Sequence, residues 1–230
     1  MGKKEALEYI DSKAELVTEV SDKIWGYAEL SLMEHQSSEL YVEGLKKEGF
    51  QVETPVCGIE TAYIASYGSG KPIIGILAEY DALSGLSQEA GAVERKEVIP
   101  GGHGHGCGHN MLGAGAMAAA LAVKHYLEEK GEGSGTGKFY GCAASKAFMA
   151  KEGVFNELDA ALTWHPGTAN EVTSGTCNSC IQTEYQFTGL ASHAAGAPEL
   201  GRSALDAVEL MNIGVQFLRE HMSDECRIHY

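Results

Sequence analysis

The segment from position 101 to 110, GGHGHGCGHN, places three histidines and one cysteine among glycines. Imidazole nitrogens and a thiolate are donors that suit zinc or another borderline-soft divalent ion. Because Cys107 and His109 are separated by one residue, their side chains point to the same side of an extended loop. The spacing predicts a metal site with Cys107 and His109 as ligands, and we expect His103 and His105 to be solvated neighbours. The alternative at this point is a polar loop without any ligand.

Two further candidates follow apolar runs that are typical of strands. Asp81 comes just after PIIGILAEY, and His165 ends the run LDAALTWH. Open α/β folds place their sites at the carboxyl ends of strands, so these residues are expected at the edge that also receives the glycine-rich loop. We expect His165 to be a third ligand, and Asp81 either to bind the metal or to orient a histidine ligand. A single histidine before proline is more often structural, but the coincidence at one sheet edge favours the site.

The spacing of apolar residues defines the elements that must position these side chains. It predicts helices over 3–30, 37–47 and 111–131, with a short one over 146–155. β-branched and aromatic runs predict strands over 50–54, 61–68, 72–80, 137–143 and 158–165. The third of these strands has apolar residues on both parities, which is typical of a strand buried on both faces. The alternation predicts an α/β fold with a mostly parallel sheet and helices on both faces.

The pattern changes after about position 179. Alternating polarity predicts a half-exposed strand over 181–189, helical spacing predicts an amphipathic helix over 202–222, and CRIHY at 226–230 resembles the start of another strand. Small residues in GAGAMA at 113–118 are interpreted as close helix packing rather than as a dinucleotide fingerprint, since a polar loop precedes them. We expect two domains, 1–178 and 179–230.

Composition limits the kinds of partner. The net charge of −15 argues against nucleic acid and anionic membranes as main partners. The amino-terminal segment is charged and amphipathic, unlike a signal peptide, and no run approaches the roughly 18 apolar residues of a membrane span. We therefore expect a cytoplasmic protein whose six cysteines are free thiols or ligands. Cys177 and Cys180 form a C-x-x-C without a second pair, and are interpreted as ordinary half-buried cysteines.

Four segments, 76–86, 105–117, 152–166 and 189–212, together resemble the M20 metallopeptidase family, and most closely its amidohydrolase branch. The resemblance implies a zinc-peptidase-like α/β domain, incomplete here, followed by the first part of an α+β lid domain that usually mediates dimerisation. By that resemblance Cys107, His109 and His165 match metal ligands for a divalent ion, Zn or Mn. Asp81 matches the aspartate near the metal, and His193 matches a lid histidine that reaches a partner's active site and polarises the scissile carbonyl.

The activity that the resemblance implies is hydrolysis of the amide bond of N-acyl or N-aroyl amino acids, such as aminobenzoyl-glutamate. The substrate would be a small, dipeptide-like molecule. The chain would associate with a second copy or with a longer homologue.

Two departures from the family pattern lead us to expect an impaired enzyme. The family carries a Glu-Glu pair after the strand at 137–143, one glutamate as general base and one as ligand, whereas no acidic residue occurs between Cys142 and Lys151. Glu152 lies beyond the next apolar stretch and is a poor substitute. The family's later lid segment and last metal-binding histidine have no counterpart before Tyr230. Because a general base contributes ~10²–10⁴-fold, efficient hydrolysis is not expected. The alternative is a non-catalytic, truncated homologue acting as a metal-binding or oligomerisation partner.

Overall fold

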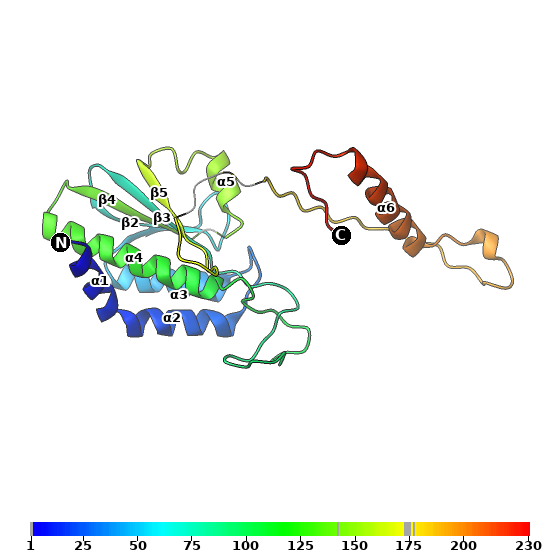
Figure 1. Ribbon diagram of the computed structural model, residues 1–230, viewed down its shortest axis with the longest axis horizontal. Helices are drawn as coiled ribbons and strands as arrows, with labels where there is room; N and C mark the ends of the chain where they lie inside the picture. The colour runs from blue at the N-terminus through cyan, green and yellow to red at the C-terminus, as the bar shows by residue number, and fades with distance from the viewer. Residues whose placement is uncertain (1, 142, 173–175, 177) are drawn as a thin grey trace. The chain divides into compact units, whose positions relative to one another are not determined.

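The computed structural model describes residues 2–141, 143–172, 176 and 178–230. Contacts divide the chain into two compact units, Met1–Ala169 and Asn170–Tyr230 (Figure 1). The predicted metal-binding residues all lie in the first unit, and His193 lies in the second. The domain boundary expected between residues 178 and 179 stays a prediction.

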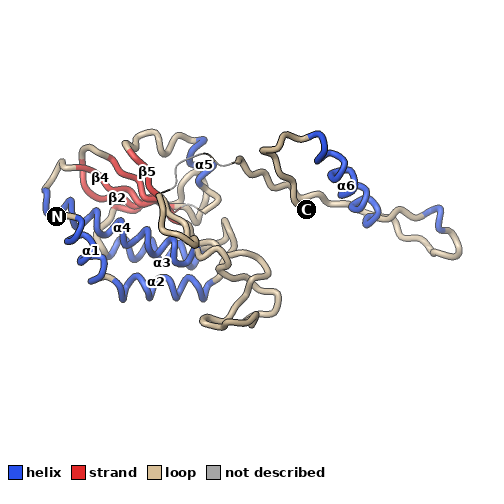
Figure 2. Tube along the Cα trace, in the orientation of Figure 1, coloured by secondary structure: helices blue, strands red, loops and turns tan. Residues whose placement is uncertain are grey.

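A five-stranded sheet with the order β1-β2-β4-β3-β5 forms the centre of the first unit (Figure 2). Its strands are β1 Gln51–Glu53, β2 Tyr63–Ser69, β3 Ile73–Ala78, β4 Gly135–Gly141 and β5 Ala160–Leu162. β3 pairs in parallel with β4 and β5, whereas β2 pairs antiparallel with β1 and β4. The α/β class is confirmed, but the sheet is mixed and not mostly parallel as expected. The connection between β1 and β2 is too short for the crossover that parallel neighbours need, so these two strands are antiparallel.

Helices cover both faces of this sheet, as predicted. They are α1 Lys3–Ser12, α2 Ala14–Tyr27, α3 His35–Lys47, α4 His109–Lys130 and α5 Lys146–Lys151. The helix expected over 3–30 is divided at Lys13, which lies between α1 and α2. No helix in the described part of the chain combines the length and apolar character needed to cross a membrane.

The two faces of the sheet bury alternate residues of the same strands. Tyr63, Ile76 and Phe139 pack with α2, α3 and α4 in the main core. Ile64 and Tyr140, the next residues along β2 and β4, pack with Met149 of α5 in a smaller cluster on the other face. This period of two confirms that the central strands are buried on both faces.

Helix α4 lies unusually close to the end of β3 and to the segment after β5. A Cβ at Gly113 would lie 2.3 Å from the Tyr41 hydroxyl oxygen and 2.7 Å from the carbonyl oxygen of Glu79. A Cβ at Gly115 would lie 2.9 Å from the indole of Trp164. Only glycine permits these approaches, so the interpretation of the small residues as helix packing is confirmed.

The second unit contains one α-helix, α6 Ala204–Leu218, and the short 3-10 helices η1 Pro198–Leu200 and η2 Arg219–His221 among its described residues. The Ser203 hydroxyl caps α6 by accepting a hydrogen bond from the amide of Asp206 at 3.0 Å. The helix prediction over 202–222 is confirmed. The strands predicted over 181–189 and 226–230 are wrong, because an alternating run forms a strand only where a second strand pairs with it, and these described residues have none.

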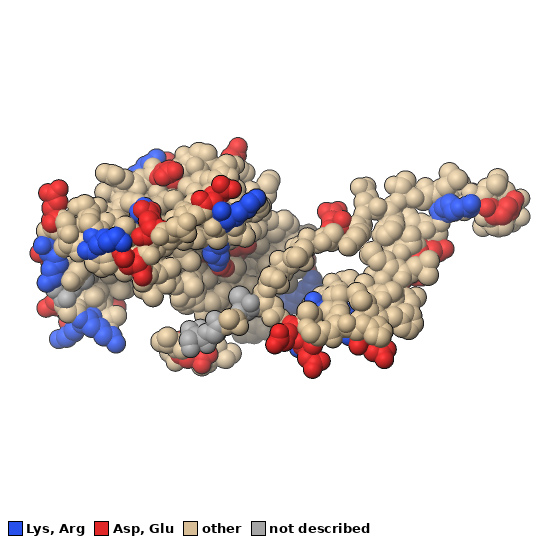
Figure 3. All heavy atoms as spheres, turned by 90° about the horizontal axis from the view of Figure 1, so that it is seen from above, with Lys and Arg blue, Asp and Glu red and all other residues tan. Residues whose placement is uncertain are grey.

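Acidic and basic side chains are interspersed on the face of the first unit that Figure 3 shows. Ion pairs in the first unit include Lys71 with Asp159 at 2.9 Å and Lys138 with Glu157. This face therefore carries mixed charge rather than a basic stripe.

Candidate metal centre

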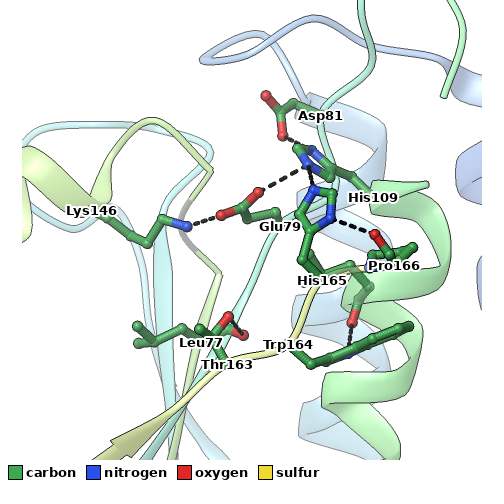
Figure 4. Close-up of polar contacts among 10 residues, drawn as sticks. Leu77, Glu79, Asp81, His109, Lys146, Thr163, Trp164, His165 and Pro166 are labelled. Atoms are coloured by element: carbon green, nitrogen blue, oxygen red, sulfur yellow. Dashed lines mark hydrogen bonds and ion pairs between the residues drawn. The ribbon is translucent and has the colours of Figure 1, made fainter. Parts of the chain in front are cut away.

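Three chain segments meet at the edge where the parallel strands end. Glu79 and Asp81 follow β3, His109 is the first residue of α4, and His165 follows β5. Figure 4 shows the side chains of Glu79, Asp81 and His165 directed toward His109. The prediction that these elements deliver their polar residues to one edge is confirmed by this arrangement.

A hydrogen bond with Asp81 orients the ring of His109. Its ring is buried, and Nδ1 lies 2.7 Å from Oδ1 of Asp81. Because an ionised carboxylate only accepts, this contact places a proton on Nδ1, and a ring that carries only this proton has its lone pair on Nε2. Of the two roles predicted for Asp81, this contact corresponds to orienting a histidine ligand.

His165 has the same tautomer for a different reason. Its Nδ1 lies 2.9 Å from the carbonyl oxygen of Pro166, which accepts a hydrogen bond from an Nδ1–H. The preceding residue anchors this segment, since the indole Nε1 of Trp164 donates to the carbonyl of Leu112 in α4 at 3.0 Å. Nε2 of His165 therefore presents a lone pair toward the start of α4.

The two Nε2 atoms lie 3.3 Å apart. Facing lone pairs repel each other unless a proton or a metal ion lies between them. For Zn–N bonds of about 2.0–2.1 Å, nitrogens separated by 3.3 Å subtend about 107° at the ion, close to the tetrahedral angle. The two histidines therefore fit a zinc-like ion.

Cys107 supplies a third donor. One ligand atom from each of Cys107, His109 and His165 lies within 4.8 Å of the others. Cys107 is half-buried and His165 is exposed, so the site is open to solvent on one side. One thiolate and two imidazoles leave a fourth position for water, which is typical of catalytic rather than structural zinc sites. The structure brings the three predicted ligands together, and their role as ligands stays a prediction.

Sequence comparison finds long matches, although no family model matches the chain. It is 48% identical over 226 residues to one of the subunits of the p-aminobenzoyl-glutamate hydrolase of Escherichia coli, a match that covers 96% of this chain and 47% of that protein. It is 28% identical to the Xaa-Arg dipeptidase of Mus musculus, over 99% of this chain and 52% of the dipeptidase. The chain thus spans about half the length of the curated relatives that it matches.

Solved structures share the fold. The aminobenzoyl-glutamate utilization protein from Klebsiella pneumoniae superposes with a TM-score of 0.55 at 20% identity, covering 87% of this chain and 57% of that one. A Bacillus subtilis protein described as a dinuclear metal-binding peptidase of the M20 family gives 0.52 at 20% identity, covering 66% and 42%. In sequence this chain is similar to the hydrolase subunit, and in fold to the M20 peptidase. Identity to the hydrolase subunit and the shared fold confirm the resemblance expected from the four segments.

A lysine from the segment after β4, where the family resemblance led us to expect a Glu-Glu pair, lies at this sheet edge. β4 ends at Gly141, residue 142 lies outside the described residues, and α5 begins at Lys146. The Lys146 ammonium forms an ion pair with Oε1 of Glu79. Burial lowers the pKa of Lys146.

Glu79 is a site residue that sequence reasoning missed. Its Oε2 lies 3.0 Å from Nε2 of His109, the nitrogen that also faces His165. The signal that could have found it was the alternation Glu-Tyr-Asp after β3. Tyr80 is buried in the core, so the residues on either side of it, Glu79 and Asp81, both face the edge.

The expectation that His105 is solvated is wrong. Its ring is 5% exposed, Nε2 lies 2.9 Å from the carbonyl oxygen of Ile24, and the ring lies against Trp25. Burial lowers the pKa of His105, which favours the neutral ring. His105 therefore ties the glycine-rich loop to α2, while His103 is exposed, as expected, and takes no part in the group of donor atoms.

Two remaining candidates lie in the second unit. Nδ1 of His193 accepts hydrogen bonds from the amides of Ala195 at 3.1 Å and Gly196 at 2.9 Å, which leaves the ring proton on Nε2. Its role toward a substrate carbonyl stays a prediction. Of the C-x-x-C pair, Cys177 lies outside the described residues, and Cys180 is an exposed free thiol, not half-buried as expected.

Replacing Asp81 by asparagine is expected to lower the affinity for zinc by roughly 10–100-fold, because the carboxylate that orients His109 is lost. Isothermal titration of chelator-stripped protein measures this change. Asp11→Asn, at an exposed position of α1, is the matched control and should bind zinc like the wild type. Equal affinities of the two variants would contradict the orienting role of Asp81.

A second buried carboxyl group, that of Glu34, predicts a pH dependence of stability. Its side chain belongs to a residue that is 1% exposed, and burial raises its pKa, although backbone amides and Thr61 partly favour the charged form. The folded state therefore binds this proton more tightly than the unfolded chain, so stability falls as pH rises from the unfolded toward the folded pKa. We expect Glu34→Gln to be more stable than wild type at pH 7 and equal to it at pH 4 in urea unfolding. A stabilisation that persists unchanged at pH 4 would argue against this explanation.

Proposed function

We propose that this chain carries the metal site of an M20-type amidohydrolase that cleaves N-acyl or N-aroyl amino acids such as aminobenzoyl-glutamate. The observation that carries the proposal is 48% identity to the Escherichia coli hydrolase subunit over 96% of the chain. The convergence of Cys107, His109 and His165 at one edge supports it. The non-catalytic alternative is not favoured, because the curated relatives include a hydrolase subunit and a dipeptidase.

In this proposal Cys107, His109 and His165 hold one divalent ion, zinc or manganese. When bound, such an ion polarises the substrate carbonyl and lowers the pKa of water. Asp81 holds a proton of His109 on Nδ1, so that the lone pair of Nε2 is available to bind the metal ion. The open side of the site, next to the exposed His165, is where a substrate amide would approach.

The proposed partners are inferred from the relatives. The Escherichia coli protein is named as a subunit of a hydrolase, and we propose that this chain likewise associates, with a second copy or with a longer homologue. His193 is the residue we propose to act on the substrate carbonyl in such an assembly. A cytoplasmic location also stays a prediction.

We further propose that hydrolysis by this chain alone is slow. The carboxylates that the described residues bring to the candidate ligands are Glu79 and Asp81, and both are engaged, with Lys146 and His109. Neither is free to take the proton of an attacking water in the way a general base must.

The test is release of aminobenzoate from aminobenzoyl-glutamate, followed by chromatography, with zinc or manganese added to chelator-stripped chain. We expect metal-dependent turnover about 10²–10⁴-fold below that of the Escherichia coli hydrolase subunit assayed in parallel. Cys107→Ala should abolish the metal-dependent turnover. Turnover equal to that of the Escherichia coli protein would overturn the proposed impairment, and release that does not depend on metal or on Cys107 would overturn the proposed function.

A further inference from the structure

A partly buried lysine lies beside the candidate metal centre. Figure 4 shows Lys146 on one side of the Glu79 carboxylate and His109 on the other. The ammonium contacts Oε1, and Oε2 lies 3.0 Å from Nε2 of His109. The side chains of Lys146 and Glu79 are 32% and 19% exposed, so solvent screens the pair only in part. The carboxylate thus connects a positive charge to a predicted ligand nitrogen.

This arrangement bears on the number of ions that the site can hold. In two-metal hydrolases the ions lie about 3.5–4 Å apart, close enough to share a carboxylate that gives one oxygen to each ion. Here Oε2 of Glu79 faces Nε2 of His109, and Oε1 faces the ammonium of Lys146. The lysine is therefore paired with the oxygen of Glu79 that a shared carboxylate would give to a second ion.

The charges of the side chains at this site also favour a single ion. The Cys107 thiolate and the Glu79 carboxylate together balance one divalent cation. Asp81, the other carboxylate at this edge, is held by Nδ1 of His109. A second divalent cation would have to displace Lys146 or be repelled by its ammonium at short range.

We propose that this centre binds a single divalent ion, with Glu79 as its carboxylate donor, because Lys146 occupies the position of a second ion. This differs from the Bacillus subtilis peptidase, which is described as dinuclear. The inference rests on the metal site of the proposed function and concerns the number of ions and the residues that set it.

The test counts ions in the whole 230-residue chain after removal of metal with a chelator. Zinc is titrated by calorimetry, bound metal is measured by elemental analysis, and cobalt is added to observe its thiolate absorption band. We expect one zinc ion per chain, lost in Cys107→Ala, with roughly 10–100-fold weaker binding in Glu79→Gln. We expect two ions per chain in Lys146→Glu, which supplies a second carboxylate, and one ion in the control Lys151→Glu on the exposed end of α5.

Two ions in the wild-type chain, or one ion in Lys146→Glu, would overturn the inference. If Lys146→Glu does not fold, Lys146→Met replaces it. Loss of the positive charge should then tighten binding of the single ion roughly tenfold, and unchanged affinity would overturn the inference. The two proposals fail separately. Hydrolysis with two ions bound would retain the proposed function and reject this inference. One bound ion without any hydrolysis would retain this inference and reject the proposed function.

Discussion

His109→Ala is expected to lower the zinc affinity of this chain by more than about 100-fold, a larger loss than that of an orienting residue. His109 is the residue at which the predicted site converges. Its Nε2 lies 3.3 Å from Nε2 of His165 and 3.0 Å from Oε2 of Glu79, and its Nδ1 binds Asp81. Alanine removes the donor and leaves the carboxylates around it without their shared partner. Calorimetric titration and the cobalt–thiolate absorption band measure the loss.

His103→Ala is the matched control for this prediction. The two histidines belong to the same glycine-rich loop, but His103 is not among the grouped donor atoms. We expect wild-type affinity from His103→Ala. If both variants bound zinc equally well, the ion would be held elsewhere. The donor atoms at the edge of the sheet would then not form the zinc site.

Phe139→Ala is expected to reduce the free energy of unfolding of the first unit by about 3–5 kcal/mol. Phe139 is in β4, the central strand of the sheet, and is fully buried. Its ring packs against Tyr41 and Tyr63, with centroid separations of 6.0 Å in both cases. Removing the ring leaves a cavity between the sheet and α3 that the rigid strands on either side cannot close.

Urea unfolding measures this effect through tryptophan fluorescence, since both tryptophans, Trp25 and Trp164, lie in the first unit. Phe148→Ala is the control. Phe148 is on α5 and is 50% exposed, so its truncation should change stability by less than about 0.5 kcal/mol. A similar loss in the two variants would mean that the core of this unit is not centred on β4.

Spacing in the sequence is sufficient to single out the three predicted metal donors. Cys107 and His109 are local to one loop, and His165 follows a run that is recognisably a strand, so the parallel pairing of β3 and β5 brings them to one edge. Glu79 and Lys146 could not be found in this way. Their importance depends on a contact between the end of β3 and the start of α5, which are far apart in the chain, and no local pattern encodes that contact.

The strand predictions also differ in whether local spacing or contact with a distant segment decides the outcome. Those at 61–68 and 72–80 hold because β4 lies between the two strands and pairs with both. The run at 181–189 has an equally regular alternation, but it has no neighbouring strand among the described residues and stays irregular. Periodicity records which side of a segment is apolar, and pairing decides whether that segment becomes a strand.

The sequence by itself determined the α/β class, the family resemblance, the three predicted metal donors and the absence of a Glu-Glu pair after the strand at 137–143, because these depend on residue identity and short-range spacing. Only the tertiary structure decided the mixed sheet, the burial of His105 and the Glu79–Lys146 ion pair at the centre. Each of these arises where segments distant in the chain come into contact. Strand pairing, burial and ion pairing depend on which segments meet there, and local spacing does not encode that.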